Sequence, residues 1–229
     1  MSQPAIQCEN YSFRFDQRRM VLNSISFKIY PNEHTAVLGL NGAGKSTLLR
    51  SLVGLHKGEG TIRIRGMEVK RSNLSHIRQK VGFIFQDPQI QLFCPSVIED
   101  VAFGPLNLYG KPERAREEAR LALSEVGFRG EEFTPCHMLS LGEMRKVSLA
   151  GVLACKPDIL LMDEPDCYLD AEGKQRLVEI LQRLNNVTRV LATHDLDFAR
   201  NLCNRCIYLE NGLITYDGQM ETFILPIYR

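Results

Sequence analysis

A glycine-rich stretch with one lysine and one serine, GLNGAGKS, occupies residues 39–46. Its spacing is G-x-x-x-x-G-K-[ST], in which glycines let successive backbone N–H groups turn toward one anion. An apolar run precedes the stretch and a helical pattern follows it, so a helix dipole would add positive potential at the same point. Lys45 is then placed to reach the β- and γ-phosphates of a nucleotide, and the Ser46 hydroxyl to ligate Mg²⁺. The stretch therefore predicts phosphate binding rather than a glycine-rich turn without a special purpose.

A pair of carboxylates ends a second apolar run, in the sequence DILLMDEP at residues 158–165. Phosphate chemistry at a glycine-rich loop needs such groups for its metal and its water. Asp163 is expected to hold Mg²⁺ through water, and Glu164 to polarise the attacking water as a general base. An apolar strand ending in two acidic residues is a weak signal alone, but it is specific beside the glycine-rich loop. We expect this strand to lie beside the strand that precedes that loop.

The elements that must position these groups can be read from periodicity. The first forty residues alternate apolar and polar positions, as half-buried antiparallel strands do, before the continuous apolar run TAVLG at residues 35–39. STLLRSLVGL at residues 46–55 has a helical pattern, and GTIRIRG at residues 60–66 is typical of another strand. The order strand, loop, helix, strand predicts an α/β core around the glycine-rich loop.

The middle of the chain has a different character. Between about residues 90 and 155 the patterns are helical, beginning with a predicted Ser-x-x-Glu capping box at Ser96 and Glu99. From residue 158 onward helix and strand patterns alternate again. The simplest interpretation is a helical insertion in an α/β core.

Composition restricts the class of protein. With 229 residues, 44% hydrophobic and 24% charged, the chain fits a globular protein rather than a disordered or fibrous one. A net charge of +1 from 28 basic and 27 acidic residues provides no overall attraction to nucleic acid or anionic lipid. The opening MSQPAIQCEN lacks a signal-peptide pattern, no apolar run is long enough for a bilayer, and the seven cysteines are expected to be reduced thiols. We expect a protein that neither spans a membrane nor is secreted.

Several short stretches of the sequence together resemble the motifs of one known family. LSLGE at residues 139–143, just before ILLMDEP, resembles the LSGGQ signature of ATP-binding cassette (ABC) ATPases, and the likeness extends over essentially the whole chain. Gln86 matches the Q-loop glutamine, PDCYLD at residues 165–170 the D-loop, His194 the switch histidine, and Phe15 the aromatic residue that stacks on adenine. The resemblance implies one ABC ATPase domain over residues 1–229, with a P-loop RecA-like core, an N-terminal antiparallel β subdomain and an inserted α-helical subdomain at about 90–155.

The same resemblance assigns roles to individual residues. ATP and Mg²⁺ are implied, with catalytic roles for Lys45, Glu164 and His194 and metal contacts from Ser46, Gln86 and Asp163. The residues implied to contact nucleotide are Phe15, Gly39, Leu40, Asn41, Gly42, Ala43, Gly44, Lys45, Ser46, Thr47, Gln86, Ser140, Gly142 and Glu143.

In that family two ATPase domains pack head to tail, so the signature of one covers the γ-phosphate bound by the other. Ser140 and Glu143 can instead form a simple capping box, and both interpretations can hold together. Leu141, Glu143, Cys167 and Tyr168 depart from the family pattern. Because Ser140 and Gly142 are kept, we expect an active ATPase, in a homodimer or a heterodimer.

The segment QDPQIQLFCPSVIEDVAFGPLNLYG, at residues 86–110, resembles ATPases of energy-coupling factor transporters and of cobalt and nickel importers. It implies a subunit at the cytoplasmic face of the cell membrane that powers uptake of a micronutrient such as cobalt, nickel or biotin. The implied partners are a transmembrane coupling protein, whose basic side chains would suit Gln86–Gln91, Glu99 and Asp100, and a substrate-binding membrane subunit.

Two alternatives are weighed against an importer. A soluble ABC ATPase acting on ribosomes or DNA would normally show a second cassette, a long coiled-coil insertion or a basic arm, and none is visible in the sequence. No nucleic acid is therefore expected. A small-molecule kinase would leave LSLGE, the D-loop and His194 as coincidences.

Overall fold

The computed structural model describes residues 3–15, 19–184 and 186–225. It contains two compact units. The described residues of Met1–Ile77 and Asn186–Arg229 form the first unit, and those of Arg78–Asn185 form the second. None of the described helices combines the length and apolar character needed to cross a bilayer.

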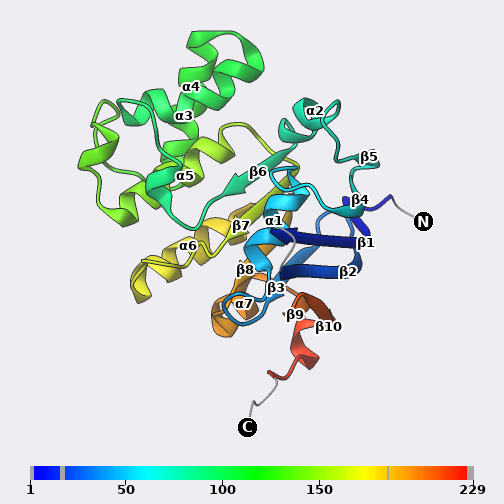
Figure 1. Ribbon diagram of the computed structural model, residues 1–229. Coiled ribbons are helices and arrows are strands. Elements are labelled where there is room, and N and C mark those ends of the chain that lie inside the picture. The colour runs from blue at the N-terminus through cyan, green and yellow to red at the C-terminus, as the bar shows by residue number, and fades with distance from the viewer. Residues whose placement is uncertain (1–2, 16–18, 185, 226–229) are drawn as a thin grey trace. The chain divides into compact units, whose positions relative to one another are not determined.

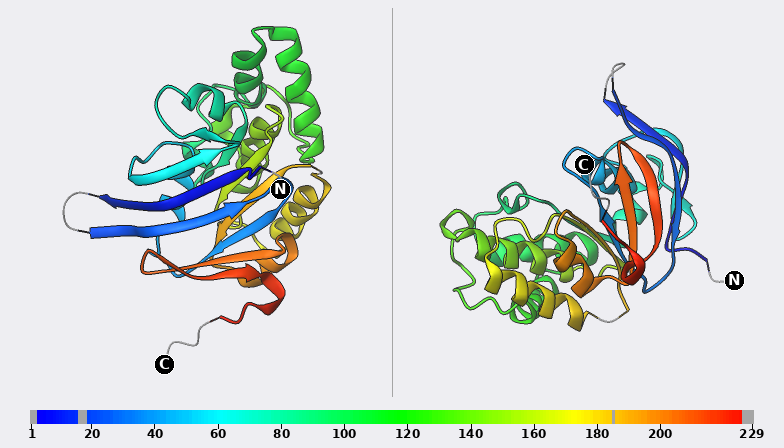
Figure 2. Two further views of the ribbon diagram at one scale, coloured as in Figure 1. Left: turned by 90° about the vertical axis from the view of Figure 1, so that its right-hand side faces the viewer. Right: turned by 90° about the horizontal axis from the view of Figure 1, so that it is seen from below.

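An antiparallel sheet in the first unit has the strand order β2-β1-β4-β5. It contains β1 (Ile6–Phe15), β2 (Arg19–Ile29), β4 (Glu59–Ile64) and the short β5 (Met67–Glu68). β1 and β2 run side by side as a long pair, drawn in dark blue (Figures 1 and 2). Alternate residues of β1 are buried, which confirms the antiparallel strands predicted from alternation in the first forty residues.

The second sheet of this unit runs in the order β10-β9-β3-β8. Here β3 (His34–Leu38) pairs in parallel with β8 (Thr188–Thr193) and with β9 (Arg205–Glu210), while β10 (Leu213–Gln219) is antiparallel to β9. Because β8 and β9 occupy both edges of β3, the prediction that the DILLMDEP strand lies directly beside it is wrong. The register is set by long-range pairing that sequence spacing does not reveal.

Three helices and one 3₁₀ turn complete the first unit. These are α1 (Lys45–Leu52), α2 (Leu74–Arg78), which ends at the boundary between the units, α7 (Leu196–Leu202) and η3 (Met220–Thr222). Helix α1 buries Leu48, Leu49 and Leu52 completely, so its position is fixed by core packing.

The second unit joins one parallel strand pair to a group of helices. β6 (Val81–Ile84) pairs with β7 (Ile159–Asp163), with Ile84 opposite Met162. The helices predicted between about residues 90 and 155 are α3 (Val97–Tyr109), α4 (Pro112–Glu125) and α5 (Leu141–Leu153), drawn in green in Figure 1. The unit also contains α6 (Ala171–Arg183), η1 (Pro88–Ile90) and η2 (Cys136–Met138).

The start of α3 differs from the prediction of a capping box. Ser96 is the N-cap residue, but its hydroxyl donates to the Glu99 carboxylate at 2.7 Å instead of accepting from the helix backbone. The carbonyls of Thr134 and Glu132 accept from the N–H groups of Val97 and Ile98, at 3.1 and 2.8 Å. A neighbouring loop therefore supplies the acceptors that a capping side chain would otherwise provide.

Close packing against β2 fixes the glycine-rich loop. A Cβ atom on Gly44, whose φ is +106°, would lie 2.9 Å from the Val21 carbonyl oxygen and from Leu22 Cδ2. A Cβ atom on Gly39 would lie 2.3 Å from the carbonyl oxygen of Leu209 on β9. Glycine is required at these positions because the backbones of two strands approach the loop closely.

The substitution Gly44→Ala is expected to lower the free energy of unfolding by about 1–3 kcal/mol, because it combines an unfavourable φ with a steric clash. Urea denaturation of the nucleotide-free protein measures this effect. Gly151→Ala is the matched control, since Gly151 lies inside α5 and a Cβ atom there would be 3.8 Å from its nearest neighbour. The control should be neutral or stabilising by up to about 1 kcal/mol. Equal stability of Gly44→Ala and the native protein would contradict this account of the loop.

Candidate active site

The glycine-rich loop leaves β3 and leads directly into α1, as the motif requires. The Lys45 side chain is only 4% exposed, and its Nζ donates to the carbonyl oxygens of Gly39 at 2.8 Å and Leu40 at 3.3 Å. Among the described residues no side chain caps α1 at Gly44. The positive end of the helix dipole and the Lys45 ammonium therefore act at the same loop, which is the arrangement that stabilises a phosphate.

His194 lies at the same edge of the sheet as this loop. Leu38 of β3 is opposite Thr193 of β8, so Gly39 and His194 each follow the end of adjacent parallel strands. The turn after His194 is fixed because Asp195 donates its N–H to Thr193 Oγ1 at 3.0 Å and caps α7. The imidazole is exposed, as a group that meets a ligand must be.

Phe15 belongs to the same unit and presents half of its surface to solvent. Its ring is 51% exposed and packs edge-on against Phe13, with centroids 4.8 Å apart, and against His56, at 5.2 Å. Phe13 and His56 stack on each other at 4.8 Å. This aromatic cluster holds the Phe15 ring firmly while leaving it accessible, which suits the predicted stacking on adenine.

The carboxylates of the second unit lie where β7 ends. Asp163 is fully buried, and Glu164 is 7% exposed with a left-handed backbone at φ +43°. This conformation costs a non-glycine residue about 1–2 kcal/mol. Gln86 follows β6, the parallel neighbour of β7, and its Nε2 donates to Glu164 Oε2 at 3.1 Å. Strand pairing therefore brings together two of the predicted site residues that are distant in sequence.

The predicted ligands have the chemistry that Mg²⁺ requires. The predicted ligands are the Ser46 hydroxyl in the first unit and the Gln86 amide and Asp163 carboxylate in the second, all oxygen donors of the kind that Mg²⁺ prefers. In the described ranges no group of three His, Cys, Asp or Glu side chains could hold a metal ion alone. Mg²⁺ keeps several waters and uses substrate phosphates as ligands, so it needs few protein donors from either unit.

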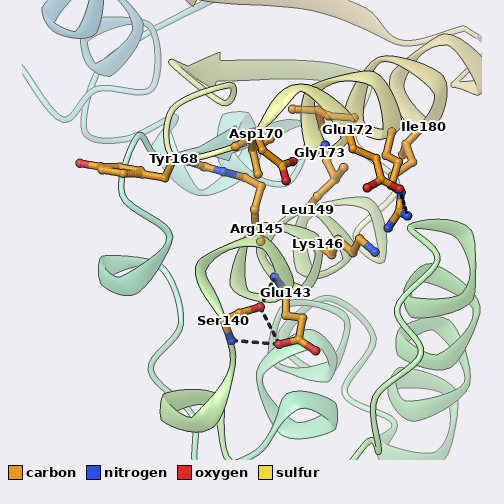
Figure 3. Close-up of a pocket in the computed structure, with 14 residues that line it drawn as sticks. Ser140, Glu143, Arg145, Lys146, Leu149, Tyr168, Asp170, Glu172, Gly173 and Ile180 are labelled. Carbon is orange, nitrogen blue, oxygen red and sulfur yellow. Dashed lines mark hydrogen bonds and ion pairs between the residues drawn. The ribbon is translucent and has the colours of Figure 1, made fainter.

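The signature stretch begins α5 with the capping box that the sequence suggested. The Ser140 hydroxyl accepts from the Glu143 N–H at 3.4 Å, and Glu143 Oε2 accepts from the Ser140 N–H at 2.9 Å and its hydroxyl at 2.7 Å (Figure 3). These hydrogen bonds from Ser140 lower the pKa of the Glu143 carboxyl. A Cβ atom on Gly142 would meet nothing within 4 Å, so space remains beside the helix end.

A pocket of about 380 Å³ adjoins this helix start within the second unit. Its lining includes Ser140 and Glu143 from the signature, Arg145 further along α5, and Tyr168 and Asp170 from the D-loop (Figure 3). The Tyr168 ring extends away from the other labelled side chains and is largely exposed. The signature and the D-loop of one chain therefore line the same polar pocket.

Sequence reasoning missed two residues near Glu164. In the sequence, Cys167 stands out only as a departure from the D-loop pattern, and none of the motifs assigns a role to Arg145. Cys167 Sγ donates to Glu164 Oε2 at 3.2 Å, and the Arg145 guanidinium donates to the carbonyls of Phe85 and Gln86. One available signal was the position of Arg145 on the buried face of α5, next to Met144 and one turn before Leu149.

The substitution Glu143→Gln is expected to lower the melting temperature at about pH 7, and the difference should shrink as the pH falls toward about 3. The pKa of Glu143 is lower in the folded state than in the unfolded state. Its ionised form therefore adds stability above the unfolded pKa, and that stability is lost as the pH falls through the folded pKa. Thermal unfolding at several pH values measures this. A difference that is the same at both ends of the range would contradict an ionised cap.

Comparisons with known proteins give the family. A family model described as ABC transporter matches residues 22–166. The energy-coupling factor transporter ATP-binding protein EcfA of Carboxydothermus hydrogenoformans is 40% identical over 217 residues, which are 93% of this chain and 80% of that protein. EcfA2 of Methanospirillum hungatei is also 40% identical, over 96% of this chain, and the chain spans 56% of its length.

Solved structures of ABC ATPases are also similar to this chain. The structure of cbiO1 from Clostridium perfringens, described as part of the ABC transporter complex cbiONQ, has a TM-score of 0.86 and 31% identity, covering 96% of this chain and 90% of that one. The ATP-binding cassette MJ0796, solved as a dimer in a post-hydrolysis state bound to ADP and Pi, has a TM-score of 0.85 and 26% identity, covering 95% and 100%. The chain therefore belongs to the ABC transporter family and has the fold of its ATP-binding domains.

Proposed function

We propose that this chain binds ATP with Mg²⁺ and hydrolyses it to power uptake of a micronutrient, such as cobalt, nickel or biotin, through membrane partners. The observation that carries the hydrolytic part is the Glu164 carboxylate, buried at the end of β7 and hydrogen bonded by Gln86. A carboxylate in such a position is suited to accept a proton from water.

The first unit supplies the groups that bind nucleotide. Lys45 exchanges the carbonyls of Gly39 and Leu40 for phosphate oxygens, and the loop N–H groups of residues 39–47 surround the phosphates. Phe15 stacks on the adenine, and His194 contacts the γ-phosphate from the neighbouring strand end. These contacts orient the terminal phosphate and stabilise its charge.

The second unit supplies the groups that activate water. Glu164 accepts a proton from the attacking water, while Gln86 orients the carboxylate through the hydrogen bond at 3.1 Å. Ser46, Gln86 and Asp163 would hold Mg²⁺, which neutralises negative charge on the phosphates when bound. The buried position of Glu164 excludes competing water and strengthens these interactions.

A second ATPase subunit completes each site in this proposal. The start of α5, with Ser140 and Gly142, presents an anion site to nucleotide bound by the partner, and Glu143 lies at its edge. The open space beside Gly142 supports this role, as does the dimeric state of the similar MJ0796 cassette. The partner is a second copy of this chain or a related ATPase.

Docking to a membrane partner is supported by an exposed apolar patch on the second unit. Its members are Phe93, Phe103 and, one turn further along α3, Leu106. The Phe93 ring is 65% exposed and meets Phe103 edge-on, with centroids 4.9 Å apart. Asp100 Oδ2 accepts from the N–H groups of Phe93 and Cys94, both at 2.8 Å, and holds this loop against α3. Such a fixed aromatic patch is suited to an apolar segment of another protein.

The carboxylates predicted to meet basic side chains belong to the same segment. Asp100 accepts from its own loop and Glu99 from Ser96, so both also hold the local structure. The segment that resembles energy-coupling factor ATPases thus carries exposed aromatic rings as well as these carboxylates. In this proposal a transmembrane coupling protein docks on these rings and holds the chain at the cytoplasmic face of the cell membrane. A separate membrane subunit would select the substrate.

The hydrolytic role predicts different effects for two substitutions. Glu164→Gln should leave ATP binding within about twofold and lower turnover by about 10²- to 10⁴-fold, because it removes the general base. Lys45→Ala should weaken ATP binding itself, because it removes the ammonium that contacts the phosphates. Equilibrium binding and steady-state phosphate release measure the two effects. Undiminished turnover by Glu164→Gln would overturn the role of this glutamate.

The docking role is tested by Phe93→Ser. The tagged native protein should bring down a polytopic membrane protein and a smaller substrate-binding one from gently solubilised membranes, identified by mass spectrometry. Phe93→Ser should lose both, because truncating a central aromatic residue typically costs an interface about 2 kcal/mol or more. Tyr30→Ser is the matched control, since Tyr30 is an exposed aromatic residue of the first unit. Recovery with ribosomes or DNA alone would overturn the importer proposal.

A further inference from the structure

Two donors converge on one oxygen of Glu164. Gln86 Nε2 lies 3.1 Å from Oε2 and Cys167 Sγ lies 3.2 Å from the same atom, while the two donors are 4.0 Å apart. The backbone reinforces this arrangement, because the Cys167 N–H donates to the Glu164 carbonyl at 3.1 Å and closes a tight turn. The turn thus fixes the thiol over the carboxylate that precedes it by three residues.

Cys167 is the second hydrogen-bond donor to this carboxylate. Its thiol carries one proton, and the separation of 3.2 Å between Sγ and Glu164 Oε2 directs that proton at the carboxylate oxygen.

Arg145 holds the backbone of Gln86, which is the other donor to Glu164. Its side chain is 3% exposed, and its two terminal nitrogens donate to the carbonyls of Phe85 at 2.6 Å and Gln86 at 2.5 Å. The planar guanidinium can satisfy two successive carbonyls at once, which the single ammonium of a lysine cannot match in geometry. Arg145 thereby sets the backbone from which the Gln86 amide reaches Glu164.

A purely structural explanation of these contacts is incomplete. Burying a guanidinium is costly, and here its hydrogen bonds go to the one segment that carries Gln86 rather than to a carboxylate. Glu164 is also held in a left-handed conformation that is unfavourable without surrounding contacts. The contacts of Cys167 and Gln86 converge on this strained residue, and Arg145 holds the backbone of Gln86.

We propose that Cys167, and Arg145 acting through Gln86, are positioning residues that hold the Glu164 carboxylate in place for water activation. The inference rests on the proposed hydrolytic function. It also links the helix that begins at Ser140 to the carboxylate of the same chain, because Arg145 lies on α5. Arg145 and Glu164 are thus connected through Gln86, whose backbone carbonyl accepts from the guanidinium and whose side chain donates to the carboxylate.

Substitutions at Cys167 test the direct contact. Cys167→Ala should lower kcat by about tenfold or more, the loss expected for one hydrogen bond to a charged group, with KM for ATP within about twofold. Cys167→Ser should restore most of kcat, because a hydroxyl also donates. Cys155→Ala is the matched control and should keep native kcat, since Cys155 donates to the Gly151 carbonyl elsewhere on the unit. Equal loss in the alanine and serine variants, or none in alanine, would overturn the donor role.

A double-mutant cycle tests the indirect contact. Arg145→Met should lower kcat in the native background but have no further effect when combined with Gln86→Ala, because Arg145 acts through Gln86. Independent effects that multiply would overturn this connection. Arg145→Lys keeps the charge and serves if the methionine variant does not fold, with the same expected loss of effect in the Gln86→Ala background. Arg120→Met, which removes an exposed ion pair with Glu132, is the matched control for losing a guanidinium.

The outcomes separate this inference from the proposed function. If Glu164→Gln turns over ATP at the native rate, the proposed general base is wrong and the positioning role fails with it. If Glu164→Gln is inactive while Cys167→Ala and the arginine variants have native kcat, the hydrolytic function stands and only the positioning role is overturned.

Discussion

Parallel strand pairing is the constraint on which the candidate site depends. In the first unit, β3 and β8 end together because Leu38 lies opposite Thr193, and the glycine-rich loop and His194 follow at that edge. In the second unit, β6 and β7 end together because Ile84 lies opposite Met162, and Gln86 reaches Glu164 there. A one-residue slip in either pair would turn these side chains to the other face of the sheet. The register of two strand pairs thus sets the chemistry of both units.

The core around β7 offsets the unfavourable conformation at its end. Glu164 has a left-handed backbone that costs about 1–2 kcal/mol. Leu160, Leu161 and Met162, immediately before it, are essentially fully buried, and each such side chain contributes about 1.5–3 kcal/mol. The strand is therefore anchored firmly enough to hold a strained residue at its tip. The hydrogen bonds from Gln86 and Cys167 then determine where the carboxylate points.

Much of the candidate site could be predicted from the sequence, because each of its motifs is formed by a few consecutive residues. The glycine-rich loop, the acidic pair after β7 and the alternation in β1 are contiguous in sequence, and the structure has the corresponding strand, loop and helix. The neighbours of β3 were predicted wrongly because the pairing of Leu38 with Thr193 joins distant parts of the chain. The Ser96 capping box failed for a similar reason, since Glu132 and Thr134 supply the acceptors.

Long-range contacts also explain why the partners of Arg145 were not predicted, although its place in the helical pattern indicated a buried position. A charged residue in a helical pattern is usually part of a solvated face, and only the structure shows that Arg145 is buried against the Phe85–Gln86 backbone.

In the signature stretch, Glu143 and a bound phosphate would compete for the Ser140 hydroxyl. The Ser140 hydroxyl donates a hydrogen bond to the Glu143 carboxylate, whose negative charge lies at the positive end of the α5 dipole. This interaction stabilises the helix, but a phosphate at the same place needs the same donor and the same positive potential. The neutral glutamine of the family pattern would cap the helix while opposing an anion less. In the proposed dimer, Glu143 would stabilise the start of α5 while opposing a phosphate there, whereas the open space beside Gly142 would let the phosphate approach.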